Sequence, residues 1–157
     1  MSIDGGRQAI ETYWLANWTT TPTVGLAGRT AIITVDLLPV VRLTIRGGLA
    51  LTRSMGLAIS GQNIIAYVGT LTAEIWTDGA AGDVLPNTYA ETIMGLLHGK
   101  TLDGAGAIVT SAGQTALIRF SPPELGRSSN PYPGTPTTEP PMRQTSVIAP
   151  FVRYETR

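Results

Sequence analysis

A proline-rich stretch late in the chain restricts the folds that this sequence can adopt. Residues 126–144 read GRSSNPYPGTPTTEPPMRQ, a composition incompatible with a helix or a central strand, because proline fixes φ and lacks a backbone N–H. Residues 146–155 then alternate apolar side chains and predict one more strand. Pro150 cannot donate a hydrogen bond to a neighbouring strand, which favours an edge position for it. The chain must therefore return from a long excursion to add its last strand.

Composition indicates one domain. The 157 residues are 43% hydrophobic and 14% charged, enough for a sizeable core, and 18 glycines with 11 prolines indicate short elements and many turns. A formal net charge of zero argues against a global field that would hold a polyanion or a membrane surface. The absence of cysteine excludes disulfides and thiolate metal sites. Without a signal-peptide pattern or an apolar run of roughly 20 residues, we expect a soluble protein made in a cytoplasm.

Two segments carry helical periodicity. Residues 3–18 place apolar side chains at near-helical spacing, and residues 84–97 do the same. In the second segment, Thr88 and Glu91 have the spacing of a capping box, and Gly99 stands where a C-terminal cap favours glycine.

Strand patterns fill most of the remaining chain, at residues 30–35, 40–46, 63–78, 107–113, 114–122 and 146–155. We expect glycines 47 and 48 to end the second of these strands and Gly69 to mark a bulge or bend in the third. Residues 49–62 read as a loop or a mobile hairpin arm. The order of elements predicts an α+β fold, a mixed, mainly antiparallel sheet packed against two helices, with extended loops.

The sequence offers no convincing catalytic, cofactor or metal site. His98 is the only histidine, and its place near the end of the second helix suits a charge that favours the helix C-terminus. No G-x-S-x-G elbow is present, and the glycine-rich residues 78–83 match neither phosphate-binding fingerprint. We expect no enzyme and no cofactor.

Charged and aromatic side chains suggest surfaces instead. Arg42, Arg46 and Arg53 predict a small basic patch on the polar face of the strand at 40–46 and its continuation. Glu74, Asp78 and Asp83 predict a solvated or interfacial acidic patch. Tryptophans, Trp76 among them, are expected to be core or interface anchors. Candidate contacts for a neighbouring subunit are Arg42, Arg46, Arg53, Trp76, Asp78, Asp83, Pro131, Tyr132, Pro133 and Pro136.

The succession of segments resembles the tail terminators of lambda-like tailed bacteriophages over most of the chain. The N-terminal helix RQAIETYWLANW precedes the strand LPVVRLTIRGG, and the long strand YVGTLTAEIWTD leads into the helix TYAETIMGLLHGKTL and then GAIVTSAG. The proline-rich residues 126–144 depart from that family's compact pattern.

This resemblance implies a structural virion protein. Terminators of the family form a ring, usually of six copies, on the head-proximal end of the tail tube, where they end tube polymerisation and present a docking surface to the head or neck. Its expected partners are further copies of itself, the tail tube protein and a head or neck connector, with DNA passing through the ring without sequence-specific binding. No membrane partner and no catalytic residue are implied.

The proline-rich segment then has a candidate role. Extended proline-rich chain is stiff, so residues 131–141 are expected to reach a neighbouring subunit or the tube, as are residues 49–62. A flexible surface loop is the alternative for both. Two other functions stay open at this point, a neck or head-completion connector, and a monomeric binding module with Trp76 and residues 78–83 lining a pocket.

Overall fold

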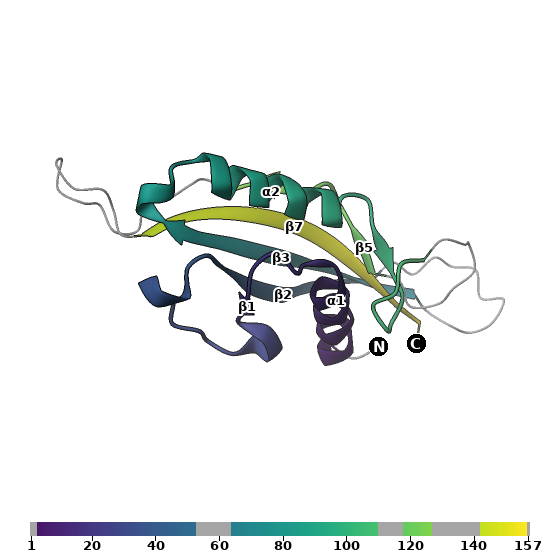
Figure 1. Ribbon diagram of the computed structural model, residues 1–157. Helices are drawn as coiled ribbons and strands as arrows, with labels where there is room; N and C mark the ends of the chain where they lie inside the picture. Colours follow the sequence, from purple (N-terminus) through teal and green to yellow (C-terminus); the bar gives the residue numbers. More distant parts are fainter. Residues whose placement is uncertain (1–2, 53–63, 110–117, 127–141, 157) are drawn as a thin grey trace.

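Two helices pack on one face of a seven-stranded sheet (Figure 1). The computed structural model describes residues 3–52, 64–109, 118–126 and 142–156. The elements are α1 (Ile3–Asn17), β1 (Thr23–Val24), β2 (Val40–Thr52), β3 (Ile64–Asp78), α2 (Val84–Leu97), β4 (Thr101–Leu102), β5 (Ile118–Phe120), β6 (Glu124–Leu125) and β7 (Met142–Thr156), with short 3-10 turns η1 (Leu26–Gly28), η2 (Val35–Leu37) and η3 (Gly79–Ala81).

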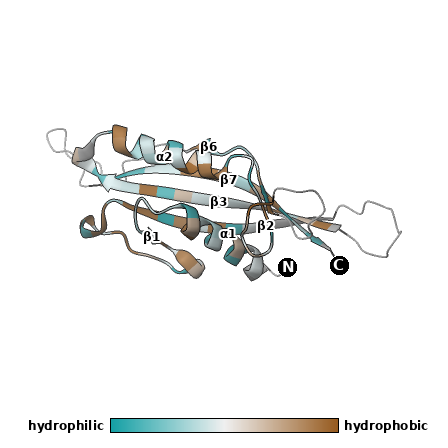
Figure 2. Ribbon diagram, turned by 45° about the vertical axis from the view of Figure 1, so that its right-hand side comes forward, coloured by the Kyte–Doolittle hydropathy of each residue, from teal (hydrophilic) through white to brown (hydrophobic). Residues whose placement is uncertain are grey.

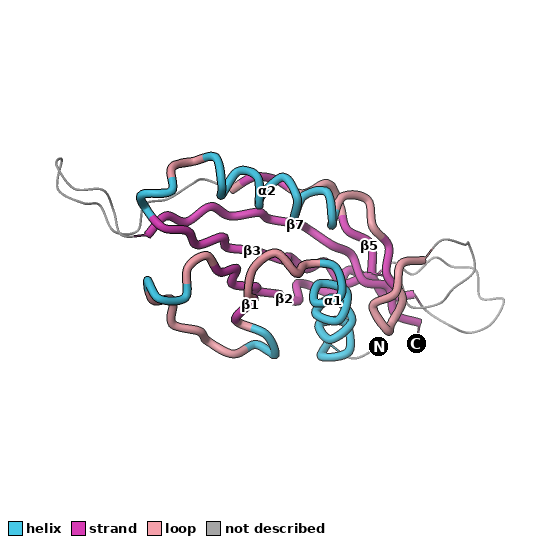
Figure 3. The backbone as a smooth tube through the Cα atoms, in the orientation of Figure 1, coloured by secondary structure: helices cyan, strands magenta, loops and turns pink. Residues whose placement is uncertain are grey.

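The strand order is β1-β2-β3-β7-β5-β4, and β6 also pairs with β7. Among the strands of the described residues, the pair β1–β2 alone is parallel, and the other pairs are antiparallel. This confirms the predicted α+β fold with a mixed, mainly antiparallel sheet. Three long strands, β2, β3 and β7, form the centre of the sheet and run together through most of its length (Figure 3).

The main core lies between this sheet and both helices. Alternation in the three long strands turns one set of apolar side chains toward the helices, as the pattern predicts. The core includes Ile10, Trp14, Val41, Leu43, Leu71, Ile75, Ile93, Leu97, Val147 and Ala149. The two helices also contact each other, since the Tyr13 hydroxyl donates a hydrogen bond of 2.7 Å to the carbonyl of Leu96.

The predicted end of the second strand at glycines 47 and 48 is wrong, because β2 continues to Thr52. The bulge expected at Gly69 lies instead in β2, between Gly47 and Ala50. Gly69 is regularly paired with Gly47 on one side and Phe151 on the other. A Cβ at position 69 would lie 2.3 Å from the Phe151 ring, so the absence of a side chain there makes room for that ring.

The last strand is central, which corrects the predicted edge position. β7 pairs with β3 along its whole length and with β5 and β6 along its other side. The Pro150 carbonyl accepts a hydrogen bond of 2.8 Å from the Ser121 N–H. Ser121 lies between β5 and β6. Pro150, which lacks an N–H, is therefore opposite the gap between these two short strands, and β7 loses no hydrogen bond of its regular pairing with either strand.

The strand predicted at residues 30–35 is absent. These residues form a loop that enters η2, and Ile32 is 82% exposed. β-branched composition alone indicated a strand there, but the loop leaves the sheet after β1 and has no partner strand.

The second helix begins one turn before the predicted capping box. Asp83 is the N-cap residue, and Thr88 lies inside α2, where its hydroxyl donates to the Val84 carbonyl. Gly99 does adopt the left-handed conformation, φ 65°, just beyond the helix end, as predicted.

Several predictions fall partly or wholly outside the described residues. They concern the arm at 49–62 beyond Thr52, much of the strands at 107–113 and 114–122, the proline-rich arm at 131–141, and the candidate contacts Arg53, Pro131, Tyr132, Pro133 and Pro136.

Candidate functional site

The face of the sheet opposite the helices carries mostly polar side chains. The alternation that buries Val41, Leu43 and Ile75 turns their neighbours outward. A shallow cavity of about 330 Å³ lies on this outer face and is lined by Thr44, Arg46, Thr70, Thr72, Glu74 and Ile148. α2 lies beside β7 and α1 beside β2 (Figure 2), and both helices contribute side chains to the one core that lies against the opposite face. The outer face is therefore a surface that neither helix covers.

One end of the outer face is closed by the loop that precedes β2. Val40, Trp76 and Met142 are buried there, with Val24, Ile33 and Leu38 packed against them. Trp76 is only 8% exposed, so it anchors this second small core, as one of the predicted roles requires. Its buried indole Nε1 has no hydrogen-bond partner among the described residues.

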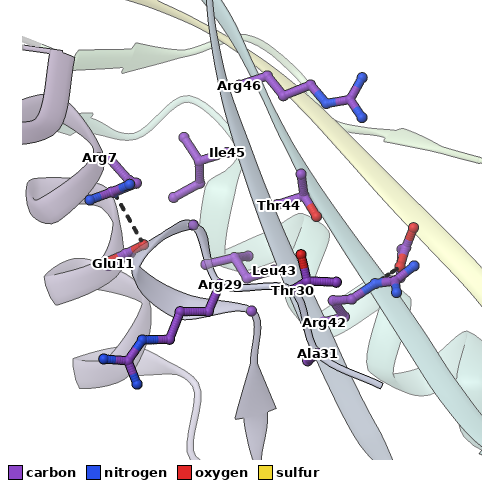
Figure 4. A pocket seen from close by; sticks show the side chains of 13 residues that line it. Arg7, Glu11, Arg29, Thr30, Ala31, Arg42, Leu43, Thr44, Ile45 and Arg46 are labelled. Carbon is purple, nitrogen blue, oxygen red and sulfur yellow. Dashed lines mark hydrogen bonds and ion pairs between the residues drawn. The ribbon is translucent and has the colours of Figure 1, made fainter. Parts of the chain in front are cut away.

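A cleft of about 390 Å³ runs beside β2 at the edge of the sheet (Figure 4). Its lining comes from α1, from the chain that follows β1, from β2 itself and, through Glu74, from β3. Four arginines and two glutamates contribute, namely Arg7, Arg29, Arg42, Arg46, Glu11 and Glu74. The cleft thus concentrates positive charge on a chain that is neutral overall.

Two of the arginines are committed to carboxylates of this chain. Arg42 forms an ion pair with Glu74 on the neighbouring strand, and its guanidinium lies 5.7 Å from the centre of the Trp76 ring. The Arg7 Nε lies 3.7 Å from the Glu11 carboxylate. That carboxylate also accepts a hydrogen bond of 2.8 Å from the Ala27 N–H and so fixes η1 against α1.

The other two arginines, Arg29 and Arg46, are exposed and have no carboxylate partner among the residues that the structure describes. Their side chains point in different directions in Figure 4, that of Arg46 to the same side of β2 as Arg42 and that of Arg29 to the α1 side. A pocket for a small anion requires convergent donors. In this cleft, Arg46 and Arg29 lie on opposite sides of the edge of β2, so their guanidinium groups do not converge on one point.

That strand edge is open beyond β1. β1 pairs only with Val41 and Arg42, and the Val41 N–H donates a hydrogen bond of 3.0 Å to the Pro22 carbonyl. Because backbone direction alternates along a strand, the N–H and C=O of Ile45 point to the same edge as those of Val41. In the described chain no strand lies beside Ile45 on that edge. The cleft therefore borders backbone groups available to another strand.

The predicted acidic residues do not form one shared patch. Glu74 is paired with Arg42 on the outer face. Asp78 accepts a hydrogen bond of 3.0 Å from the Ala80 N–H and caps η3. Asp83 is ion-paired with Arg143, although its side chain is 73% exposed. Arg42 and Arg46 do share the outer face of β2, as expected.

The other edge of the sheet, beyond β7, carries residues that sequence patterns did not identify. β6 is only two residues long, and both Glu124 and Leu125 are exposed. Leu125 is 56% exposed, although it lies in a paired strand. A two-residue strand gives no periodicity, and the only sequence signal was an apolar residue directly after two prolines and an acid.

His98 is exposed just beyond α2. Within residues 3–52, 64–109, 118–126 and 142–156, no group of three histidine, aspartate or glutamate side chains is placed to hold a metal ion. Neither α1 nor α2 is long and apolar enough to cross a membrane. No protein-family model matches the chain, and no curated protein is significantly similar to it.

Proposed function

We propose that this protein is a structural subunit of a tailed-phage virion that caps the head-proximal end of the tail tube as a ring of copies. In this role it stops tube polymerisation and offers the head or neck a docking surface. The proposal starts from the resemblance of the chain to lambda-like tail terminators. One structural observation supports it most. In the part of the chain that the structure describes, the sheet is built on three long strands, has a polar face that neither helix covers, and has a different open edge on each side.

Such a sheet suits assembly better than chemistry. Open strand edges recruit other strands, and two unlike edges on one molecule favour head-to-tail contacts, which form a ring when the rotation from copy to copy closes. A terminator must match the tube end on one side of its ring and present a non-matching surface on the other. Shape and edge chemistry are sufficient for that task, so the proposal assigns no catalytic group.

The outer face gives the proposed ring a polar surface. Thr44, Thr70 and Thr72 lie beside Arg46 on it. If this face lines the opening of the ring, DNA passes a surface that is polar and only weakly positive, because Glu74 offsets Arg42. A passage of this kind binds DNA without reading its sequence.

The test is to grow tail tubes from purified tube protein with and without this protein. We expect tubes of limited length that carry a ring at one end in electron micrographs. A parallel mixture with portal-bearing heads separates a terminator from a neck connector, since the connector reading predicts binding to heads without tubes. Tubes that lengthen without limit and never bind the protein would refute the proposal.

A further inference from the structure

We propose that copies of this chain join head to tail by antiparallel pairing of β6 of one copy with the open edge of β2 in the next. The contact has a defined register, in which Ile45 lies opposite Leu125 and Arg46 opposite Glu124. This inference names the two surfaces that meet in the proposed ring. It rests on the proposed function for the existence of that ring.

The edge that β6 brings to the contact follows from how β6 is hydrogen-bonded. Glu124 pairs with Ile148 and Leu125 with Val147. The Gly126 N–H donates a hydrogen bond of 2.6 Å to the Ser146 carbonyl, so Gly126 faces β7. Alternation along the strand then turns the N–H and C=O of Leu125 away from β7. β6 pairs with β7 alone in the described chain, which leaves these two groups at the sheet edge.

The edge that β2 brings to the contact lies on the opposite side of the same sheet. Ile45 presents its own N–H and C=O beyond the end of β1, and the cleft of about 390 Å³ borders it. Ile45 and Leu125 each have one outward donor and one outward acceptor, which is the requirement for a hydrogen-bonded antiparallel pair.

Strand direction agrees with this pairing. β2 is antiparallel to β3, β3 to β7, and β7 to β6, so β6 runs opposite to β2 within one copy. A neighbour that continues the sheet in the same sense brings its β6 antiparallel to this β2. No strand has to reverse its direction for the sheet to continue from copy to copy.

The side chains also match on both faces in this register. Leu125 lies opposite Val147 in its own copy and so is on the helical face, where Ile45 also lies. Glu124 lies opposite Ile148 and so is on the outer face, as is Arg46. The pairing thus brings an exposed leucine to an isoleucine, and a glutamate to an arginine that has no carboxylate partner in the described chain. Both kinds of cross-strand pair are favourable.

Among the described residues, β4, the strand beyond β5, leaves the β6 edge accessible. A Cβ on Gly106, in the turn after β4, would lie 2.3 Å from the Ala9 carbonyl oxygen, so this turn is seated directly on α1. The β4 end of the sheet therefore lies against α1. β6 pairs with Val147 and Ile148 of β7, on the other side of Pro150 from the residues that pair with β5, and Figure 2 shows it beside α2 and β7.

Because the chain has no cysteine, disulfide cross-linking can test the register directly. Arg46 and Glu124 form a non-hydrogen-bonded pair in it, with Cα atoms about 4.5 Å apart, within the range that a disulfide spans. In a single copy three strand spacings of about 4.8 Å separate them, too far for an internal bridge. The variant carrying Arg46→Cys and Glu124→Cys should give, on mild oxidation, a ladder of covalent multimers that ends at the ring size.

Three controls accompany the cross-link. Arg46→Cys mixed with Glu124→Cys should give dimers only, because each copy then has one thiol. Thr44→Cys with Glu124→Cys should cross-link at least about tenfold less, since a diagonal pair about 7–8 Å apart is out of range. Oxidation is repeated with tail tubes present, in case copies meet only there. Absence of the ladder with and without tubes would overturn the contact.

Charge reversal gives a second, independent measurement. Arg46→Glu and Glu124→Arg should each weaken self-association about tenfold in sedimentation, and the double variant should return to within about threefold of the parent. Glu91→Arg, an exposed change on α2, is the matched control and should have no effect. Two weakened single variants without recovery in the double variant would contradict the Arg46–Glu124 pair.

The results separate this inference from the proposed function. Rings that cap tubes but neither cross-link nor respond to Arg46→Glu refute the β2–β6 contact and leave the terminator role standing. Cross-linked rings that ignore tubes support the contact and refute that role. Cross-links that form only to the tube protein, from Arg46→Cys against cysteines placed in it, refute the assignment of the β2 edge to a second copy.

Discussion

At Gly69 the fold depends on the absence of a side chain. A Cβ there would lie 2.3 Å from Phe151 and 2.8 Å from the Arg46 carbonyl oxygen, and the second neighbour is backbone. We therefore expect Gly69→Ala to destabilise the protein by about 1–3 kcal/mol in urea unfolding. Gly95→Ala is the control, because nothing lies within 4 Å of that position on α2 and alanine favours a helix. It should stabilise by about 0.5–1 kcal/mol, and equal effects would contradict this account.

Tyr13 links the two helices through its hydroxyl, and burial raises the pKa of that hydroxyl above its ordinary value of about 10. A raised pKa means that the Tyr13 hydroxyl keeps its proton to a higher pH in the folded state than in the unfolded chain. The contribution of the protonated hydroxyl to folding stability is therefore full below about pH 10. It is lost as the pH rises through the higher pKa of the folded state. Tyr13→Phe should cost about 1 kcal/mol at neutral pH.

The same variant tests the sign of this pH dependence. The difference in unfolding free energy between the parent and Tyr13→Phe should shrink above about pH 10, because ionisation removes the hydrogen bond from the parent alone. Urea midpoints measured between neutral pH and about pH 11 decide the matter. A difference that stays constant across this range would rule out titration of Tyr13 as its source.

At the scale of elements, the ion pair between Asp83 and Arg143 joins the start of α2 to the start of β7. The Asp83 side chain is 73% exposed, so water and salt screen the pair. We expect Asp83→Asn to change stability by less than about 0.5 kcal/mol in thermal or urea unfolding. A loss above about 1.5 kcal/mol would mean that this pair, rather than the buried contacts of α2, holds the helix to the sheet.

Elements with a clear apolar period were predictable from sequence. Alternation at Val41, Leu43 and Ile45 identified a half-buried strand, and helical spacing identified residues 84–97 to the residue. The position of β7 was not predictable, because proline was taken as a mark of an edge, and only Ser121 and the break between β5 and β6 explain why Pro150 is tolerated in the centre. Local pattern gives the element, whereas its neighbours depend on contacts distant in sequence.

The candidate site was predictable in part for the same reason. Arg42 and Arg46 could be placed on one polar face from alternation alone. Arg29 was hidden by the incorrect strand at 30–35, and β6 was too short to produce any pattern. That Glu124 and Arg46 lie on the same face at opposite edges of one sheet follows only from the full strand order.

At the scale of the whole molecule, association and stability should be linked. A contact made only by folded copies stabilises the folded state by mass action, so the melting temperature should rise with protein concentration. Over a 100-fold range we expect a rise of about 5 °C for the parent and a much smaller one for Arg46→Glu. Calorimetry at several concentrations measures this. A melting temperature that does not depend on concentration would exclude association of the isolated protein.

The central place of β7 also bears on how the chain acquires its structure. β7 lies between β3 and the strands β5 and β6, yet it follows all of them in the sequence. Until Met142–Thr156 has been synthesised, β3 exposes a full-length unpaired edge and the two parts of the sheet have no strand between them. Pairing across such sequence separations is slow, and open strand edges favour aggregation in the meantime. Nascent chains halted before residue 142 should therefore depend on chaperones, while those released after residue 156 should not.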